Sequence, residues 1–266
     1  MTSSSPASSP TTILSPYENL SLHLKQLRLS NMLSHWETVE NQATQEQWSY
    51  AQFLLALCEL ELQRRVQARQ TKALREAQLP SAKSFTSFDF SHCKQLNPAP
   101  LMQLAEDPTW LERAENCLIF GPSGVGKTHL GISMARAMIT LGKRVRFFSA
   151  ITLVQQLQVA KQQLQLPATL AKLDRFDLLI LDDIGYVKKT DDETSVLFEL
   201  IAHRYERRSL LITANHPFSQ WDSIFSDSMM TVAAVDRLVH HALIIEIKAE
   251  SYRKQAAANR AKANSS

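Results

Sequence analysis

One eight-residue segment constrains the fold of this 266-residue chain more than any other part. It runs from Gly121 to Thr128 as Gly-Pro-Ser-Gly-Val-Gly-Lys-Thr, and it matches the pattern G-x-x-x-x-G-K-[ST] at every defined position. The chain holds only six glycines, roughly a third of what its length would ordinarily carry, and three of them stand in this segment. The clustering indicates one backbone segment that needs conformations other residues adopt poorly.

The segment predicts a site for nucleotide phosphates. Its glycines let backbone N–H groups point inward around an anion, and the N-terminus of the following helix adds partial positive charge. Lys127 is expected to reach the β- and γ-phosphates of ATP, and the Thr128 hydroxyl to coordinate Mg²⁺. The predicted cofactor-binding residues are Gly121, Pro122, Ser123, Gly124, Val125, Gly126, Lys127 and Thr128.

Strand and helix patterns alternate from Asn116 onward. Short apolar runs predict strands at 117–120, 145–148, 178–181, 210–213 and 243–247. Helical patterns lie between them, at 128–141, 152–165, 191–207 and 229–241. This alternation predicts an α/β fold, a parallel sheet with helices on both faces, and ligands on such sheets bind at the carboxyl ends of the strands.

The third predicted strand ends in two carboxylates, Asp182 and Asp183. Downstream of a phosphate-binding loop, this pattern is typical of a Walker B element. Asp182 is expected to hold Mg²⁺ through water, and Asp183 to polarise the water that attacks ATP. Paired carboxylates beside a metal stay ionised because the ion offsets their mutual repulsion.

Two more polar residues lie where the sheet would present them to the γ-phosphate. Asn215 can orient the attacking water, but Thr213 lies nearer the strand end and competes for this role. An ordinary Asn turn before Pro217 fits the sequence equally well. Arg237, just before the last strand, can pair locally with Asp236 or reach the nucleotide of a neighbouring subunit as an arginine finger.

Composition divides the chain into five parts. Residues 1–16 are rich in Ser, Thr and Pro, lack charge, and predict a disordered tail without the pattern of a secretion signal. Residues 17–80 predict a small all-helical domain, and a role in DNA binding or oligomerisation is assigned to it only by the family resemblance described below. Residues 81–110 are proline-containing and predict a linker that docks on the next domain. The α/β domain is expected at 111–254, and a basic tail at 255–266.

Other classes of protein are excluded or disfavoured. No stretch approaches the roughly 18 consecutive apolar residues that a transmembrane helix needs. The three cysteines are widely spaced, which favours free thiols in a reducing cytoplasm over disulfides or a metal site. A zinc site is disfavoured because His240 and His241 would point to opposite sides of a helix.

Basic residues gather in two places although the net charge is only +3. One patch lies between Glu61 and Lys83 and includes Arg64, Arg65 and Arg69; the other follows Lys248. Solvated helix faces and nucleic-acid contacts both explain such patches.

The ordered set of motifs resembles the DnaC/IstB branch of the AAA+ ATPases, and most closely the IstB-like helpers of insertion-sequence transposition. The likeness runs from about residue 17 to 254. Its motifs are Phe53–Leu55, Glu59–Glu61, Phe88–Phe90, Gly121–Leu130, Leu178–Tyr186, Arg204–Ser209, Leu211–Asn215, Pro217–Trp221, Asp236–Ala242 and Glu250–Arg253.

The resemblance implies an AAA+ sheet preceded by a helical domain, without the usual C-terminal lid. Such proteins bind ATP and Mg²⁺, assemble as ATP-dependent homo-oligomers on duplex DNA without reading sequence, and recruit a transposase that selects the target site. The resemblance adds His129 to the cofactor-binding residues, matches Asn215 to sensor 1 and Arg237 to a trans-acting arginine, and makes Arg253 a candidate second sensor. The catalytic set is then Lys127, Asp183, Asn215 and Arg237.

Residue 183 departs from the wider superfamily, in which many members carry Asp-Glu at Walker B. The shorter carboxylate of Asp183 predicts slow hydrolysis that DNA or a partner stimulates. In an oligomer the basic patches would be repeated, so Arg64, Arg65 and Arg69 are predicted to hold DNA or a neighbouring subunit, with Lys188 and Lys189 as weaker candidates.

Several alternatives remain open at the level of sequence. The nearest is a replicative-helicase loader of the DnaC type, which has the same ATPase core and a different client. A small-molecule kinase lacks an evident substrate or lid segment, and a GTPase lacks the N-K-x-D motif. A binding module in which ATP only fixes assembly stays open because of Asp183.

Overall fold

A computed structural model describes residues 15–93, 95–185, 190–217, 220–221, 228–249 and 251–252. The two tails therefore lie largely outside the described residues, as do Lys188, Lys189 and Arg253. The chain divides into two compact units, residues 1–69 and 70–266, and each is described by itself.

The first unit is all-helical. It contains α1 (Pro16–Gln26), α2 (Ser30–Gln45) and most of α3 (Tyr50–Ala77). Ser15 begins α1 with a capping box, in which its side chain accepts from the backbone N–H of Glu18 and the Glu18 carboxylate accepts from the backbone N–H of Ser15. The core of this unit is small and is built from buried side chains of all three helices: Leu24, Met32, Trp36, Val39 and Leu57.

The second unit is built on a five-stranded sheet in which every strand pair is parallel, in the order β2-β3-β4-β1-β5. The strands are β1 (Asn116–Phe120), β2 (Val145–Ser149), β3 (Leu178–Asp182), β4 (Ser209–Ala214) and β5 (Ala242–Glu246). This confirms the predicted α/β class. Because β1 lies between β4 and β5, the loop after β1 emerges beside the end of β4.

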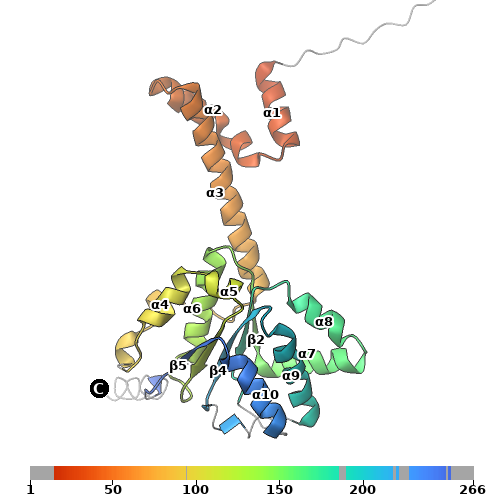
Figure 1. Ribbon diagram of the computed structural model, residues 1–266. Coiled ribbons are helices and arrows are strands. Elements are labelled where there is room, and N and C mark those ends of the chain that lie inside the picture. Colours follow the sequence, from red (N-terminus) through yellow and green to blue (C-terminus); the bar gives the residue numbers. More distant parts are fainter. Residues whose placement is uncertain are drawn as a thin grey trace, which may run out of the picture. The chain divides into compact units, whose positions relative to one another are not determined.

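Helices cover both faces of the sheet (Figure 1). The longer helices are α6 (Lys127–Thr140), α7 (Ala150–Gln162), α8 (Leu166–Leu173), α9 (Asp191–Arg204) and α10 (Ser228–Val239). Alternate strand residues divide between the two sides: Ile119 and Ile180 pack in the core with α6, whereas Leu118 and Leu181 pack in the core with α7 to α10. Strands buried on both faces explain the continuous apolar runs in the sequence.

The segment predicted as a linker, 81–110, has structure of its own. It holds two 3₁₀ turns, η1 (Phe85–Ser87) and η2 (Phe90–His92), and the helix α4 (Ala99–Glu106); α5 (Thr109–Glu112) follows. Leu101 of α4 and Trp110 of α5 are buried in the core on the α6 side of the sheet. Within the described residues, no helix has both the length and the apolar character needed to cross a membrane.

Candidate nucleotide-binding site

The loop between β1 and α6 has the backbone that its glycines predict. Gly121, Gly124 and Gly126 have φ values of 152°, 85° and 100°, in a region that residues with a side chain rarely adopt. At Gly126 there is also no room, because a Cβ would lie 2.6 Å from Cε2 of Phe88. Gly126 immediately precedes α6, so the loop leads directly into a helix N-terminus, which favours a bound anion.

Lys127 connects this loop to the end of β4. Its side chain is 5% exposed, and its Nζ donates to the backbone oxygen of Pro122 at 2.9 Å and to Oδ1 of Asn215 at 2.6 Å. The structure therefore brings Lys127 and Asn215 together across the top of the sheet. The ammonium therefore lies beside the loop that the glycines shape.

Thr128 and Asp182 form the second part of the site. The Thr128 hydroxyl lies 2.9 Å from each carboxylate oxygen of Asp182, which ends β3. Burial raises the pKa of Asp182, against the hydrogen bonds from Thr213 and Thr128, which lower it. A bound cation would stabilise the ionised form of this partly buried carboxylate.

Thr213 joins the two aspartates. Its buried hydroxyl donates to Oδ1 of Asp182 at 2.7 Å and accepts from the backbone N–H of Asp183 at 2.9 Å. Asp183 has a φ of 59°, a left-handed conformation that Asp tolerates better than most residues. The Thr213 hydroxyl thus donates one hydrogen bond and accepts one, and both go to the aspartates. The side chain near the end of β4 that contacts Lys127 is Asn215.

A cavity of about 330 Å³ opens beside the phosphate-binding loop. Residues 123–129 and Asp183 line one part of it. The remainder is lined by the segment predicted as a linker and by the described end of the chain, through Lys83, Ser87, Phe88, Asp89, His92, Cys93 and Tyr252. The cavity thus combines a phosphate cradle with aromatic side chains, which suits a nucleotide.

His129 attaches the aromatic wall of this cavity to α6. Its Nε2 lies 2.9 Å from the backbone oxygen of Ser84 and 3.1 Å from Oγ of Ser87, and its ring meets Phe88 edge to face. Burial and the nearby charge of Lys83 lower the pKa of His129, against the Ser84 hydrogen bond, which raises it. Folding therefore disfavours protonation of this ring.

Tyr252 closes another side of the cavity. Its backbone N–H donates to the oxygen of Gly124 at 3.1 Å, and its ring meets His92 edge to face, with centroids 5.2 Å apart. The sequence motifs did not place Phe88, His92 or Tyr252 in the site. The aromatic run Phe85–Phe90 predicted only that this proline-containing segment docks on the α/β domain.

Arg237 lies apart from these residues and does not line the cavity. It stands near the end of α10, donates to the backbone oxygen of Ala233 at 2.8 Å, and has its guanidinium over the ring of Phe198, 5.3 Å from the centroid. With Tyr205, Asp236 and exposed Met229 and Val232 it lines a separate groove. Of the predicted catalytic residues, the structure groups Lys127, Asp183 and Asn215 at the ends of the strands and places Arg237 elsewhere.

The residues present fit ATP and Mg²⁺. The glycines at 121, 124 and 126 give the loop its positive φ values, and a loop of this kind lets backbone N–H groups approach phosphate oxygens closely. The Thr128 hydroxyl and the desolvated Asp182 carboxylate are hard oxygen donors side by side, which is the type of ligand that Mg²⁺ takes.

Comparison with known proteins agrees with this chemistry. The family described as IstB-like ATP binding protein matches residues 22–260. A protein of Sinorhizobium fredii, described as an insertion sequence ATP-binding protein, is 49% identical over 90% of this chain and 80% of its own length. The IS21 ATP-binding protein of Pseudomonas aeruginosa is 35% identical over 88% of each chain.

Solved structures show the same fold at lower identity. DnaA of Aquifex aeolicus, bound to AMPPCP, is 18% identical and superposes with a TM-score of 0.53 over 70% of this chain and 56% of that one. DnaI is 17% identical, with a TM-score of 0.51 over 64% of this chain and 90% of that one. These similarities show that the chain shares the fold of DnaA and DnaI.

Proposed function

The chain belongs to the IstB-like ATP-binding proteins of insertion sequences, and on this basis we propose that it is an ATPase that assembles on duplex DNA and activates a transposase. The observation that carries the ATP-dependent part is the joining of Lys127, Thr128, Asp182 and Asn215 around one phosphate cradle. The relatives at 35–49% identity are described as insertion sequence proteins, which favours this role over that of a helicase loader.

ATP would lie with its phosphates in the loop 121–128 and its base in the aromatic part of the cavity. Lys127 would exchange its contact with Asn215 for the β- and γ-phosphates, and Thr128 with Asp182 would hold Mg²⁺. When bound, Mg²⁺ neutralises phosphate charge and polarises the oxygens. His129 would act indirectly, by holding the segment 84–88 that closes the cavity.

Hydrolysis requires a water molecule held in line with the γ-phosphate. Asp183 lines the cavity beside the loop, so its carboxylate can accept a proton from that water, while the Asn215 amide can orient it. The short Asp183 side chain reaches less far than a glutamate, which supports slow basal turnover. Both residues would approach the nucleotide from neighbouring strands, since Asp183 follows β3 and Asn215 follows β4.

Arg237 is assigned to the nucleotide of a neighbouring copy. Within one chain it does not line the cavity, and the groove that holds it is bordered by exposed Met229 and Val232. An exposed apolar rim around a cation is suited to contact with another protein surface. The nucleotide would then lie at a subunit boundary, so ATP binding would control assembly.

Arg64, Arg65 and Arg69 lie on α3 and are assigned to DNA phosphates or a neighbouring subunit. Buried Glu61 accepts from Nε of Arg65 at 2.9 Å and lies 3.8 Å from a terminal nitrogen of Arg64. The guanidinium groups still reach solvent, since the Arg64 and Arg65 side chains are 49% and 44% exposed. Glu61 thus positions Arg64 and Arg65 while leaving N–H groups for phosphate.

Electron microscopy of the chain with duplex DNA, with and without ATP, tests the proposal. Wild type with ATP should form DNA-bound oligomers, and Lys127→Ala should not. Arg237→Ala should bind ATP yet fail to hydrolyse it. DNA-bound oligomers that form equally well in wild type without ATP and in Lys127→Ala would overturn the proposal.

A further inference from the structure

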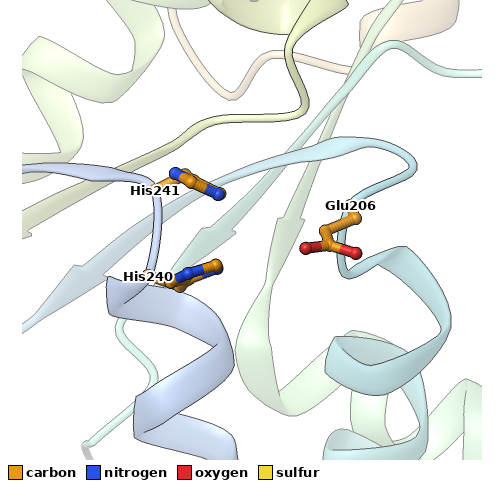
Figure 2. A group of neighbouring side chains, drawn as sticks. All are labelled: Glu206, His240 and His241. Carbon is orange, nitrogen blue, oxygen red and sulfur yellow. The ribbon is translucent and has the colours of Figure 1, made fainter.

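Two exposed histidines and a glutamate meet at a place unrelated to the nucleotide cavity (Figure 2). Their ligand atoms, one from each of Glu206, His240 and His241, all lie within 4.8 Å of one another. Figure 2 shows the Glu206 carboxylate on the turn after α9, facing the two rings at the end of α10.

The prediction that the His240 and His241 side chains point to opposite sides of a helix is wrong. It assumed that both belong to one helix, but α10 ends at Val239 and the pair forms the turn into β5. In this turn the two rings lie side by side, with centroids 4.0 Å apart and planes inclined by 45°. Both imidazoles are therefore available to a single ion.

The backbone that carries the histidines is held by a buried residue, Asn116. The Asn116 backbone N–H donates to the oxygen of His241 at 2.7 Å, and its side-chain amide donates to the oxygen of Leu238 at 3.1 Å. Its side-chain oxygen accepts from the N–H of Leu210 at 2.9 Å, at the start of β4. One side chain thus connects the histidine turn to the strand that follows the glutamate turn.

The turn that carries Glu206 is also held in place, by a hydrogen bond from a buried arginine. Buried Arg204 donates to the backbone oxygen of Ser209 at 2.9 Å and so closes the loop between α9 and β4. Both donor groups are therefore presented by backbone held in place before any ion arrives. A site whose backbone is ordered beforehand loses less entropy on binding.

Tyr205 supplies the outer contacts that metal-binding histidines ordinarily have. Its hydroxyl lies 2.9 Å from Nδ1 of His240, which orients that ring and leaves Nε2 for an ion.

We propose that Glu206, His240 and His241 form a binding site for a divalent transition-metal ion of the Zn²⁺ type. Two imidazoles and one carboxylate are a donor set that zinc prefers, and the exposure of all three leaves a fourth position for water or a group from a partner. Reaching zinc–ligand distances of about 2.0–2.2 Å requires only that exposed side chains move toward a common centre. A bound ion would join the turn before β4 to the end of α10.

The consequence for Arg237 rests on the proposed function. Arg237 lies three positions before His240 on the same helix end. An ion at this site would restrict the movement of the helix end that presents Arg237. Metal binding itself is measured without nucleotide or DNA, so its outcome is independent of the ATPase proposal.

Calorimetric titration of ZnCl₂ into the chelator-treated full chain, with millimolar Mg²⁺ present, tests the site. We expect one equivalent bound with a dissociation constant on the order of 10 µM or tighter. His240→Ala, His241→Ala and Glu206→Gln should each weaken binding by about tenfold or more, and Tyr205→Phe by up to about tenfold. His35→Ala, which removes an exposed histidine of α2, should bind as wild type does.

A second readout separates ligation from loss of folding. Zn²⁺ should raise the melting temperature of wild type and His35→Ala by several degrees, and should not raise that of the His240→Ala/His241→Ala double variant. Circular dichroism should show that all variants keep the wild-type helix content. Absence of saturable binding to wild type, or binding that persists in the double variant, would overturn the proposal.

Discussion

The ammonium of Lys127 and the amide oxygen of Asn215 lie 2.6 Å apart, although 88 positions separate them in the chain. This contact joins the first residue of α6 to the segment after β4, and it exists because β1 and β4 are neighbours in the sheet. Asn215 would therefore lose its contact with Lys127 when the phosphates of ATP bind that ammonium.

Asn215→Ala should separate binding from hydrolysis. We expect ATP affinity to stay within several-fold of wild type, because the phosphate cradle is unchanged, and the hydrolysis rate to fall about 100-fold through loss of the group that orients water. Nucleotide binding by fluorescence and single-turnover hydrolysis measure the two effects. Thr213→Val is the comparison: if it retains Mg²⁺-dependent binding while Asn215→Ala loses binding altogether, the assignment of the two residues is wrong.

Two substitutions of Asp183 should separate the effect of its carboxylate on hydrolysis from the effect of its backbone conformation on stability. Asp183→Asn keeps a residue suited to the left-handed conformation, so folding and ATP binding should persist while hydrolysis falls by about 100-fold or more. Asp183→Glu should lower the free energy of unfolding by about 1 kcal/mol, since glutamate adopts a φ of 59° less readily. Denaturant unfolding and phosphate-release assays measure these changes; a fully stable Glu variant would contradict the strain argument.

Gly126→Ala should destabilise the chain for two reasons, a positive φ and a Cβ that meets the ring of Phe88. Gly142 provides the control, because it also has a positive φ but has nothing within 4 Å of the position that a Cβ would take. Gly142→Ala should therefore cost about 1 kcal/mol, and Gly126→Ala distinctly more. In a double-mutant cycle by chemical denaturation, Phe88→Ala should relieve part of the loss of stability caused by Gly126→Ala. If the two losses in free energy of unfolding are strictly additive, the Phe88 ring moves aside without cost and the steric argument is wrong.

The lowered pKa of His129 predicts a loss of stability in acid. The unfolded chain binds a proton near pH 6.5, whereas the folded chain resists protonation, so the contribution is present above that pH and is lost as the pH falls toward the folded pKa. His129→Gln can still donate to the Ser84 carbonyl but does not titrate. Free energies of unfolding measured from pH 5 to pH 8 should therefore fall less steeply toward acid in the variant; parallel curves would exclude His129 as the source.

Neutralising Arg64, Arg65 and Arg69 together should weaken DNA binding and flatten its dependence on salt. If all three contact phosphates, the slope of log K against log salt should become less steep by up to about 2.7 per subunit. The triple Lys variant retains the charges and should keep most of the slope. Fluorescence anisotropy over a salt series measures it, and an unchanged slope in the Ala variant would assign these residues to another contact.

The sheet and the phosphate loop could be predicted because local sequence determines them. The first strand was expected at 117–120 and lies at Asn116–Phe120, since a continuous apolar run and the glycines mark its limits. The aromatic wall of the cavity could not be predicted, because Phe88 acquires its role only by packing on Gly126. The positions of the two histidines could not be predicted for a related reason: the turn after α10 accepts hydrogen bonds from Asn116, which is far away in the sequence.

The left-handed backbone at Asp183 also limits how the chain can evolve. A single base change converts an aspartate codon to a glutamate codon, so the longer carboxylate of related ATPases is always within reach of mutation. At this position the change would first reduce stability, and a lineage selected for faster turnover would need compensating changes in the turn after β3. Under the proposed function, the rate of ATP hydrolysis would be inherited together with a backbone conformation, and slow turnover would resist loss by point mutation.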